Sequence, residues 1–285
     1  FPSDDATAAD TGRTMGFYKS EVMFYKELVA LTKINTPRPL YSELDEENNF
    51  TLILEDLFPA VQGDHMIGCS LEYVKTGLNE AALLHSAFWN DKDLEQQDWL
   101  YVPSGAQGYY TTELIERSWE HFRSVYGKKL DPVIFRACDK FISCHENWNR
   151  PRTKNRCFSH NDFRVDNMLF RNDDIYVVDW QTSNYLGAGM DAAYFIGSAL
   201  PRKERKNHEL GLLEEYYRVL IDNGVENYTI NELMADYRHY SFAAAAVAIA
   251  ATVIVKQTQR GDALFLKMVE DSMYQALDND ALDLL

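Results

Sequence analysis

The chain has 285 residues, of which 46% are hydrophobic and 25% charged, and its formal net charge is −16. This length is enough to bury a sizeable core, as one large domain or as two unequal lobes. The acidic balance argues against a protein that binds DNA or RNA, because Lys and Arg contacts to phosphate dominate such binding; a solvated acidic surface explains the charge better than a cationic substrate does.

Residues 3–12 are polar and predict a turn, and residues 14–31 then repeat apolar side chains at helical spacing. Glu21 falls on the apolar stripe of this predicted helix. An inward-facing carboxylate needs a cationic partner, because burial of an unpaired charge is costly. The alternative is that Glu21 lies at the edge of the stripe and reaches water.

Two apolar runs, residues 40–44 and 50–54, flank an acidic turn and predict a pair of strands. Residues 55–59 end the second strand and begin a linker. We take this linker as the domain boundary, with residues 1–57 forming a small lobe and residues 58–285 a larger helical one.

Most of the chain after residue 78 shows helical periodicity. Predicted helices lie near residues 78–89, 115–122, 134–148, 209–222, 230–255 and 262–276. His85 and His145 fall on apolar faces, so we expect both to be core residues rather than a catalyst or a metal ligand.

The four cysteines have neither a C-x-x-C pair nor the spacing of zinc ligands, which favours reduced thiols in a cytoplasmic protein. The longest apolar run, residues 242–255, is too short to span a bilayer and predicts a buried helix, with no membrane partner. The chain begins with Phe1 rather than Met, and we expect it to be the interior of a longer chain.

Two short apolar runs, residues 168–170 and 175–178, lie on either side of a polar turn. This pattern predicts a β-hairpin. We expect Phe170 to pair with Ile175, which sets the register of the whole hairpin.

That register places Asn167 opposite Val178, so Asn167 and Asp179 emerge side by side at the open end. Asp162 lies five residues before Asn167, in a loop that must bend back towards the same end. Three oxygen-bearing side chains are therefore expected to converge. His160 precedes them, and we expect it to shape the loop by packing rather than to act as a base.

Such a cluster suits Mg²⁺, which takes a few carboxylate or amide oxygens and completes its shell with water and phosphate. Asn167 and Asp179 would hold the metal, while Asp162 would accept a proton from an attacking hydroxyl. Hairpins with flanking aspartates are common, and any two of these residues would mean little. The full spacing, with His160 included, matches the catalytic loop of kinase-like phosphotransferases.

Residues 185–191 contain two glycines and predict a flexible turn, with Asp191 placed to cap a following helix. Gly187 and Gly189 do not form a dinucleotide-binding fingerprint, because the third glycine and the βαβ unit are missing.

These motifs together resemble the aminoglycoside phosphotransferase and choline kinase superfamily. The resemblance rests on Ser159–Asp162 with Asn167, on Val178–Gln181 and on Gly187–Phe195. Its ecdysteroid kinase-like branch is closest, on the segments Leu54–Leu57, Gly63–Asp64, Leu84–Trp89 and Asp179–Gln181. It covers the chain from Phe1 to about Leu200.

The resemblance implies an α+β, two-lobed protein-kinase-like fold, with an N-terminally incomplete small lobe and a large helical lobe that carries the catalytic hairpin. ATP and Mg²⁺ are the implied cofactors, and a hydroxyl group of a small molecule the implied acceptor. In the catalytic loop, the resemblance implies Asp162 as the catalytic base, His160 as a residue of the loop and Asp191 as its brace. It implies Asn167 and Asp179 as the metal ligands. For the nucleotide, it implies Glu21 as partner of a nucleotide-binding lysine, and Glu55, Asp56 and Leu57 as the hinge that binds adenine.

The departure from the family lies at the start, where a glycine-rich strand pair and a strand lysine are missing. Lys19 and Lys26 lie on the predicted helix, so we expect the lysine to precede Phe1. A pseudokinase that binds a nucleotide or a partner without turnover is the main alternative. A metal-dependent phosphohydrolase is a further one, but the scattered histidines offer no second ligand set. The acceptor and the oligomeric state cannot be predicted; the aromatic residues could line a pocket for a bulky, sterol-like alcohol, although core packing explains them better.

Overall fold

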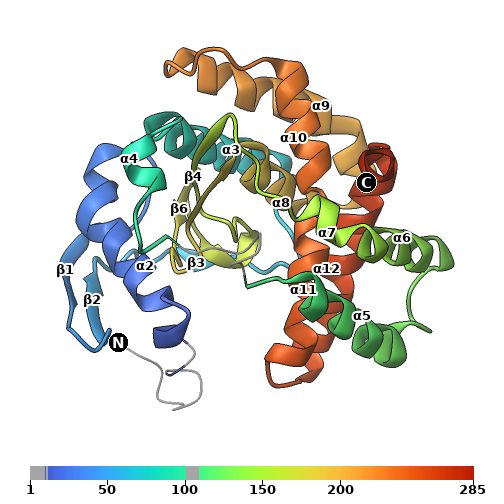
Figure 1. The fold of residues 1–285 in the computed structure, drawn as a ribbon. Helices are drawn as coiled ribbons and strands as arrows, with labels where there is room; N and C mark the ends of the chain where they lie inside the picture. The colour runs from blue at the N-terminus through green and yellow to red at the C-terminus, as the bar shows by residue number, and fades with distance from the viewer. Residues whose placement is uncertain (1–9, 11, 101–108) are drawn as a thin grey trace.

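The computed structural model describes residue 10, residues 12–100 and residues 109–285. The polar turn expected over residues 3–12 lies almost entirely outside them. In Figure 1 the N-terminal elements gather on one side of the molecule and the C-terminal helices on the other. Short strands and the long helix α3 (Leu71–Ala87) lie between these two groups.

The predicted helix over residues 14–31 is interrupted by a turn at Met15 and Gly16 and is then a continuous helical segment of mixed geometry. Helix α2 (Phe17–Met23) runs into a π-helical stretch, η1 (Phe24–Leu28), and a 3₁₀ turn, η2 (Val29–Leu31). The ring of Phe24 stacks on Trp180, with 3.6 Å between ring centroids. The segment therefore packs directly against the end of the predicted catalytic hairpin.

Both N-terminal strands are confirmed. Strand β1 (Pro39–Leu44) pairs antiparallel with β2 (Phe50–Leu54). The Asp45 carboxylate accepts hydrogen bonds from the backbone N–H groups of Glu47 and Asn49, at 2.9 and 2.8 Å. The acidic turn thus closes on its own side chain, as aspartate commonly does at turns.

Residues 35 and 36 fasten the N-terminal part to the centre. The N–H of Val177 donates to the Asn35 carbonyl at 2.8 Å, and the Thr36 hydroxyl donates to the Val177 carbonyl at 2.7 Å. Glu80 of α3 accepts from the Asn35 N–H at 2.6 Å and from its side-chain amide at 3.1 Å. A buried carboxylate therefore fixes the connection between the two parts.

Two small antiparallel sheets form the centre. One consists of β3 (Val61–Gln62), β5 (Met168–Arg171) and β6 (Asp174–Val177), and the other of β4 (Arg156–Ser159) and β7 (Asn184–Gly187). The prediction of a flexible turn beginning at Tyr185 is wrong for β7, because its residues pair with β4 and are mostly buried. Four residues are too few to show a strand period, and the nearby glycines suggested a turn.

The other helices are α4 (Lys92–Glu95), α5 (Thr112–Tyr126), α6 (Pro132–Ser143), α7 (His145–Trp148), α8 (Gly189–Ala199), α9 (Arg202–Asp222), α10 (Ile230–Tyr240), α11 (Ala243–Ile254) and α12 (Gln259–Asp278), with short 3₁₀ turns η3 (Val165–Asn167) and η4 (Ala281–Leu284). The predicted helix over residues 230–255 is broken at Ser241 and Phe242. The Ser241 carbonyl accepts a hydrogen bond from the Ser272 hydroxyl of α12 at 2.6 Å. A tertiary contact of this kind leaves no trace in local periodicity.

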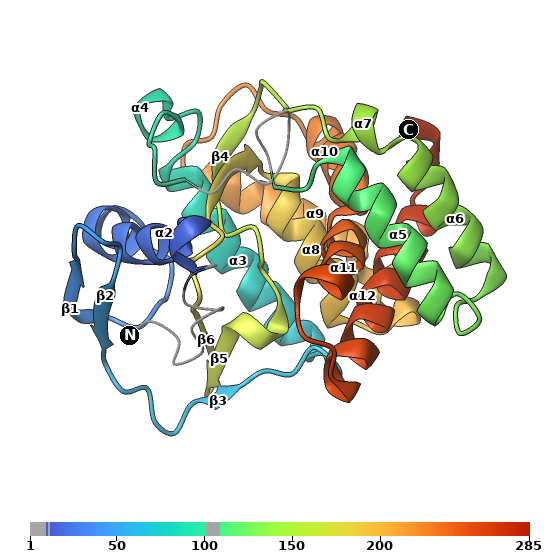
Figure 2. The same cartoon turned by 60° about the horizontal axis from the view of Figure 1, so that its bottom comes forward.

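Helix α8 is buried along its whole length. It packs against α3, α9, α10 and α12, and Figure 2 shows it in the middle of the helical part. The apolar run over residues 242–255 is confirmed as a mostly buried helix, α11. Within the described ranges, no helix combines the length and apolar character needed to cross a bilayer.

Candidate active site

The predicted register of the catalytic hairpin is confirmed. Phe170 lies opposite Ile175, and the N–H of Val178 donates to the Asn167 carbonyl at 3.0 Å. Asn167 therefore lies across from the residue before Asp179. The hairpin forms as expected because two short apolar strands meet around a polar turn.

The loop before the hairpin is held by Asp191, the third residue of α8. Its carboxylate accepts hydrogen bonds from the N–H groups of His160 and Asn161, at 2.7 and 2.9 Å. His85 of α3 approaches the same carboxylate with Nε2, at 2.9 Å. Burial alone would raise the pKa of Asp191, but the contacts with His85 and His160 outweigh it and hold that pKa below its usual value.

The prediction that Asp191 caps the helix is wrong. Helix α8 begins after Ala188, and no side chain caps it. Asp191 turns back to the loop instead, where two backbone donors and an imidazole satisfy it. His85 is a buried core histidine as predicted, because its other ring nitrogen, Nδ1, contacts the Tyr216 hydroxyl at 2.6 Å.

His160 has both ring nitrogens engaged with the backbone. Its Nε2 donates to the Val178 carbonyl at 2.9 Å, and its Nδ1 accepts from the Asp162 N–H at 3.3 Å. The ring is buried and packs against Phe163 and Trp180. His160 thus joins the loop to the hairpin, which is the packing arrangement that the sequence led us to expect.

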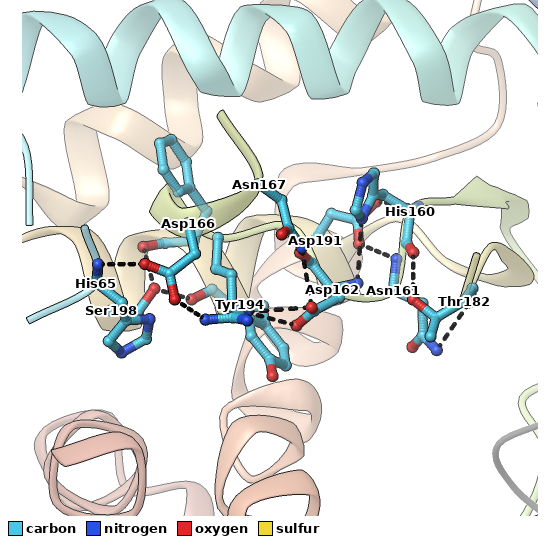
Figure 3. Close-up of polar contacts among 12 residues, drawn as sticks. His65, His160, Asn161, Asp162, Asp166, Asn167, Thr182, Asp191, Tyr194 and Ser198 are labelled. Carbon is cyan, nitrogen blue, oxygen red and sulfur yellow. Dashed lines mark hydrogen bonds and ion pairs between the residues drawn. The ribbon is translucent and has the colours of Figure 1, made fainter. Parts of the chain in front are cut away.

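Asp162 lies beside Asn167, whose side-chain amide donates to the Asp162 carbonyl at 2.8 Å and to Oδ2 at 2.9 Å. Arg164 Nε donates to both carboxylate oxygens of Asp162, at 3.0 and 3.1 Å (Figure 3). The Asp162 side chain keeps 24% of its surface exposed. A carboxylate is therefore held in a fixed orientation with one side open.

Sequence reasoning missed Arg164 and its second partner. The guanidinium also pairs with Asp166, which in turn accepts from the His65 N–H at 2.7 Å. The only local sign was the alternation of Asp162, Arg164 and Asp166 along the loop. Arg164 thus links Asp162 to Asp166, and the contact of Asp166 with His65 is visible in Figure 3.

Two residues of the site adopt the left-handed backbone conformation that favours glycine: Asn161, with φ 66°, and Asp179, with φ 70°. Asparagine and aspartate tolerate this region better than other side chains do. Such conformations cluster at functional sites. The backbone conformation thus sets the direction of the Asn161 and Asp179 side chains, at the cost of local strain.

Positive charge near the end of the hairpin compensates the acidic groups only in part: His160 and Arg164 lower the pKa of Asp179, but burial outweighs them. Burial and then the Asp162 charge raise the pKa of Asp179. Burial and then the Asp179 charge raise the pKa of Glu21 to about 8. Glu21 Oε2 is buried without a hydrogen-bond partner, so Glu21 faces inward as expected. The described residues supply no cationic partner: Lys26 is exposed, and Lys19 pairs with Asp98 at 3.0 Å.

The environment of Asp179 and Glu21 suits a bound cation. Asn167 uses its amide nitrogen on Asp162, which leaves its amide oxygen for a metal. Oxygen donors and uncompensated negative charge are what Mg²⁺ requires. In the part of the chain that the structure describes, no three His, Cys, Asp or Glu side chains are grouped to hold a metal. A magnesium ion here would therefore depend on Asn167, Asp179 and phosphate oxygens.

The predicted hinge residues lie apart from this cluster, between β2 and β3. The Glu55 N–H donates to the Arg38 carbonyl at 3.0 Å, and its carboxylate accepts from the Arg38 N–H at 2.8 Å. Asp56 Oδ1 accepts from the Phe58 N–H at 2.9 Å, and Leu57 is buried. Binding of adenine by this segment stays a prediction.

A pocket of about 200 Å³ opens beside Asp162, on the side of the C-terminal helices. Its walls are mainly apolar, and Asp162 and Arg164 form part of its polar side. The other lining residues are Tyr110, Trp148, Asn149, Asn161, Thr182, Leu186, Met190, Tyr194, Tyr240, Ala243, Ala246, Val247, Leu264, Phe265 and Met268. The sequence could not locate this pocket, because its residues come from separate helices, loops and a strand whose packing is set by the fold.

Three solved structures illustrate the similarity of the fold. A choline/ethanolamine kinase family protein from Mesorhizobium loti has 10% sequence identity and a TM-score of 0.54, over 94% of this chain and 83% of that one. Aminoglycoside 2'-phosphotransferase-IIIa, solved as a GDP complex, has 12% identity and a TM-score of 0.53, over 90% and 82%. An ethanolamine kinase from Plasmodium vivax has 14% identity and a TM-score of 0.51, over 92% and 71%.

At these identities the similarity establishes the fold, and the predicted α+β, two-lobed kinase-like architecture is confirmed. No curated protein matches the chain by sequence. The sequence profile of the ecdysteroid kinase-like family matches residues 1–226, which is most of the chain. The resemblance predicted from the catalytic-loop motifs is thereby confirmed, and the chain belongs to the ecdysteroid kinase-like family.

Proposed function

We propose that the protein is a small-molecule kinase that transfers the γ-phosphoryl group of ATP to a hydroxyl group and requires Mg²⁺. The observation that carries this proposal is the Asp162 carboxylate, which is held by Asn167 and Arg164 and faces an apolar pocket. A proton acceptor in that position is what an alcohol acceptor needs.

Asp162 orients the acceptor hydroxyl and takes its proton as the oxygen attacks the γ-phosphorus. The new bond is acceptor oxygen to phosphorus, the broken bond joins the γ-phosphorus to the bridging oxygen, and ADP leaves. Asn167 and Asp179 would hold Mg²⁺, which neutralises charge on the phosphate groups when bound. Asp191 and His160 keep the loop that carries Asp162 in place.

Glu55, Asp56 and Leu57 would contact the adenine, and Glu21 would pair with a lysine that reaches the phosphates. The high pKa of Glu21, about 8, is what an inward carboxylate shows when its cation is missing. This role predicts that Glu21 ionises once a cation binds beside it.

The acceptor is an alcohol on a largely apolar skeleton. The pocket walls are formed mostly by aliphatic and aromatic side chains from α8, α11 and α12, which favours an apolar molecule over a polycationic aminoglycoside. The family name points the same way, so an ecdysteroid, a hydroxylated steroid, is the first acceptor to test.

The test is product detection by mass spectrometry after incubation with ATP, Mg²⁺ and a panel of ecdysteroids. A product heavier by one phosphoryl group, absent without Mg²⁺ and absent with Asp162→Asn, supports the proposal. Choline and an aminoglycoside serve as comparison acceptors, and we expect neither to be phosphorylated efficiently.

The alternative is a pseudokinase that binds nucleotide without turnover. Nucleotide binding measured by calorimetry, with no phosphorylated product from any hydroxyl compound tested, would support this alternative.

A further inference from the structure

The polar side chains of the pocket beside Asp162 are almost all engaged within the protein. The amide groups of Asn149 and Asn161 donate to the carbonyls of Tyr110 and Thr182, at 3.0 and 3.1 Å. The Tyr240 hydroxyl accepts from the Gly187 N–H at 3.2 Å. These groups shape the pocket but are already committed to protein partners.

Tyr194 of α8 is the exception. It is 2% exposed, and its hydroxyl forms no hydrogen bond of normal geometry within the described parts of the chain, although the Asp162 carboxylate lies close enough to interact with it. Burying a hydroxyl group without a well-formed hydrogen bond is unfavourable. A phenylalanine would fill the same space without that cost, so the hydroxyl can gain a better partner when a molecule binds beside Asp162.

Tyr194 lines the pocket together with Asp162 and Arg164, which form its polar side. The Tyr194 side chain is close enough to Asp162 and Arg164 to feel both charges, and Figure 3 shows its ring beside the Asp162 carboxylate. Burial and then the Asp162 charge raise the pKa of Tyr194 well above its ordinary value. The phenol therefore keeps its proton and can act as a hydrogen-bond donor.

Asp162 has room for one more donor. A carboxylate offers about four lone-pair positions. Arg164 Nε takes one on each oxygen, and the Asn167 amide takes one on Oδ2. The remaining position on Oδ1 can receive the proton of an incoming hydroxyl group.

We propose that Tyr194 and Asp162 together hold the acceptor hydroxyl, with Tyr194 donating to its oxygen and Asp162 accepting its proton. This assignment rests on the proposed kinase function and names the residue that recognises the acceptor. A hydroxyl oxygen has two lone pairs, of which one receives the Tyr194 proton and the other stays free to attack phosphorus. The pocket thus selects an unhindered hydroxyl at the end of an apolar group.

The arrangement also predicts how the pocket ranks simple probes. An alcohol can use both Tyr194 and Asp162, whereas a methyl ether can only accept from Tyr194. Replacing Tyr194 by Phe removes one contact from each probe. The variant should keep the fold, because the lost hydroxyl forms no hydrogen bond of normal geometry in the described structure and its ring is kept.

The experiment measures binding of 1-octanol and of methyl octyl ether without nucleotide, through the emission of Trp148, which lines the pocket. For Tyr194→Phe we expect both dissociation constants to rise about two- to tenfold, the range of one neutral hydrogen bond. The melting temperature of the free variant should equal or exceed that of the wild type. Trp148→Phe identifies the part of the signal that comes from the pocket.

The matched control is Tyr240→Phe, which removes a pocket hydroxyl that already has a protein partner. It should leave the affinity for both probes unchanged. Three results would overturn the proposal: equal affinities in wild type and Tyr194→Phe, a lower melting temperature of that variant, or no binding of 1-octanol by the wild type. Because no ATP is present, failure here is separate from failure of phosphoryl transfer, which the product assay detects.

Discussion

Asp162 is the residue on which the proposed chemistry depends. Its carboxylate is oriented from two sides, by Arg164 and by Asn167, and neither contact blocks the side that faces the pocket. Replacing the carboxylate by an amide keeps the size of the side chain and removes the proton acceptor. The geometry therefore allows the chemical role to be tested without disturbing the loop.

For Asp162→Asn we expect turnover to fall by about 10²–10⁴-fold, the usual contribution of a general base. Binding of ATP, measured by calorimetry, should change little, because the residue contacts the acceptor rather than the nucleotide. Arg164 keeps its pairing with Asp166 in the variant, which limits the structural change. Turnover equal to wild type would remove Asp162 from the mechanism.

Asp179 allows a separate test of the metal site. Asp179→Ala should weaken ATP binding at least about tenfold in the presence of Mg²⁺, because a metal ligand is lost. Without Mg²⁺ the wild type and the variant should differ much less, since the carboxylate then only repels phosphate. The same weakening with and without Mg²⁺ would contradict a metal role.

How far the sequence predicts single residues depends on local geometry. Asn167 and Asp179 could be predicted together because the hairpin register, which the structure confirms, places Asn167 opposite the residue before Asp179. Tyr194 and Trp148 could not be assigned to a pocket, because they lie far apart in the sequence and line the same pocket only in the folded chain. Arg164 lay within the motif, but nothing in its spacing distinguished a partner of Asp162 from a solvated side chain.

At the scale of elements, the connection between α8 and the catalytic loop is the critical one. Asp191 satisfies two backbone N–H groups of the loop and faces the buried His85. Removing the carboxylate leaves these donors unpaired inside the protein. Buried polar groups without a hydrogen-bond partner strongly destabilise the folded protein.

Asp191→Ala should therefore lower the free energy of unfolding by about 3–5 kcal/mol, as breaking a buried charged pair does. Chemical denaturation followed by circular dichroism measures the loss. Asp173→Ala, in the exposed turn of the hairpin, is the matched control and should change stability by less than about 0.5 kcal/mol. A loss for Asp191→Ala no greater than for the control would mean that the loop holds its conformation without this brace.

Elements were predictable where a period could repeat. The hairpin and the pair β1 and β2 have clear apolar runs bounded by polar turns, and most helices extend over several turns. β4 and β7 were missed because each has four residues and is defined only by pairing with the other. The break between α10 and α11 was missed because it depends on a hydrogen bond from Ser272, far along the chain.

At the scale of the whole molecule, buried ionisable groups set how stability depends on pH. Burial lowers the pKa values of His65, His145 and His239 to about 4. Between pH 4 and 6.5 the unfolded chain binds protons at these residues that the folded chain does not. The contribution of these histidines to the free energy of unfolding therefore rises with pH across this window and has its full value above it.

Two glutamates act in the opposite direction. Burial raises the pKa of Glu21 to about 8 and that of Glu80 to about 7, from an ordinary value of 4.5. Above pH 4.5 the folded protein keeps protons that the unfolded chain has lost, so stability falls as pH rises through 7 and 8. The histidine contribution has its full value by about pH 6.5. Above that pH, only the loss of stability from the two glutamates remains.

We therefore expect the melting temperature of the nucleotide-free protein to decline from about pH 6.5 to about pH 8.5. Glu80→Gln should make this decline shallower, because one of the two titrating carboxyls is gone, although the variant loses an acceptor for Asn35 and is less stable at every pH. Glu72→Gln, on the exposed face of the same helix, should leave the slope unchanged. If the slope of Glu80→Gln equals that of the wild type, Glu80 is already ionised in the folded protein, and the link between residues 35 and 36 and α3 is then a charged one.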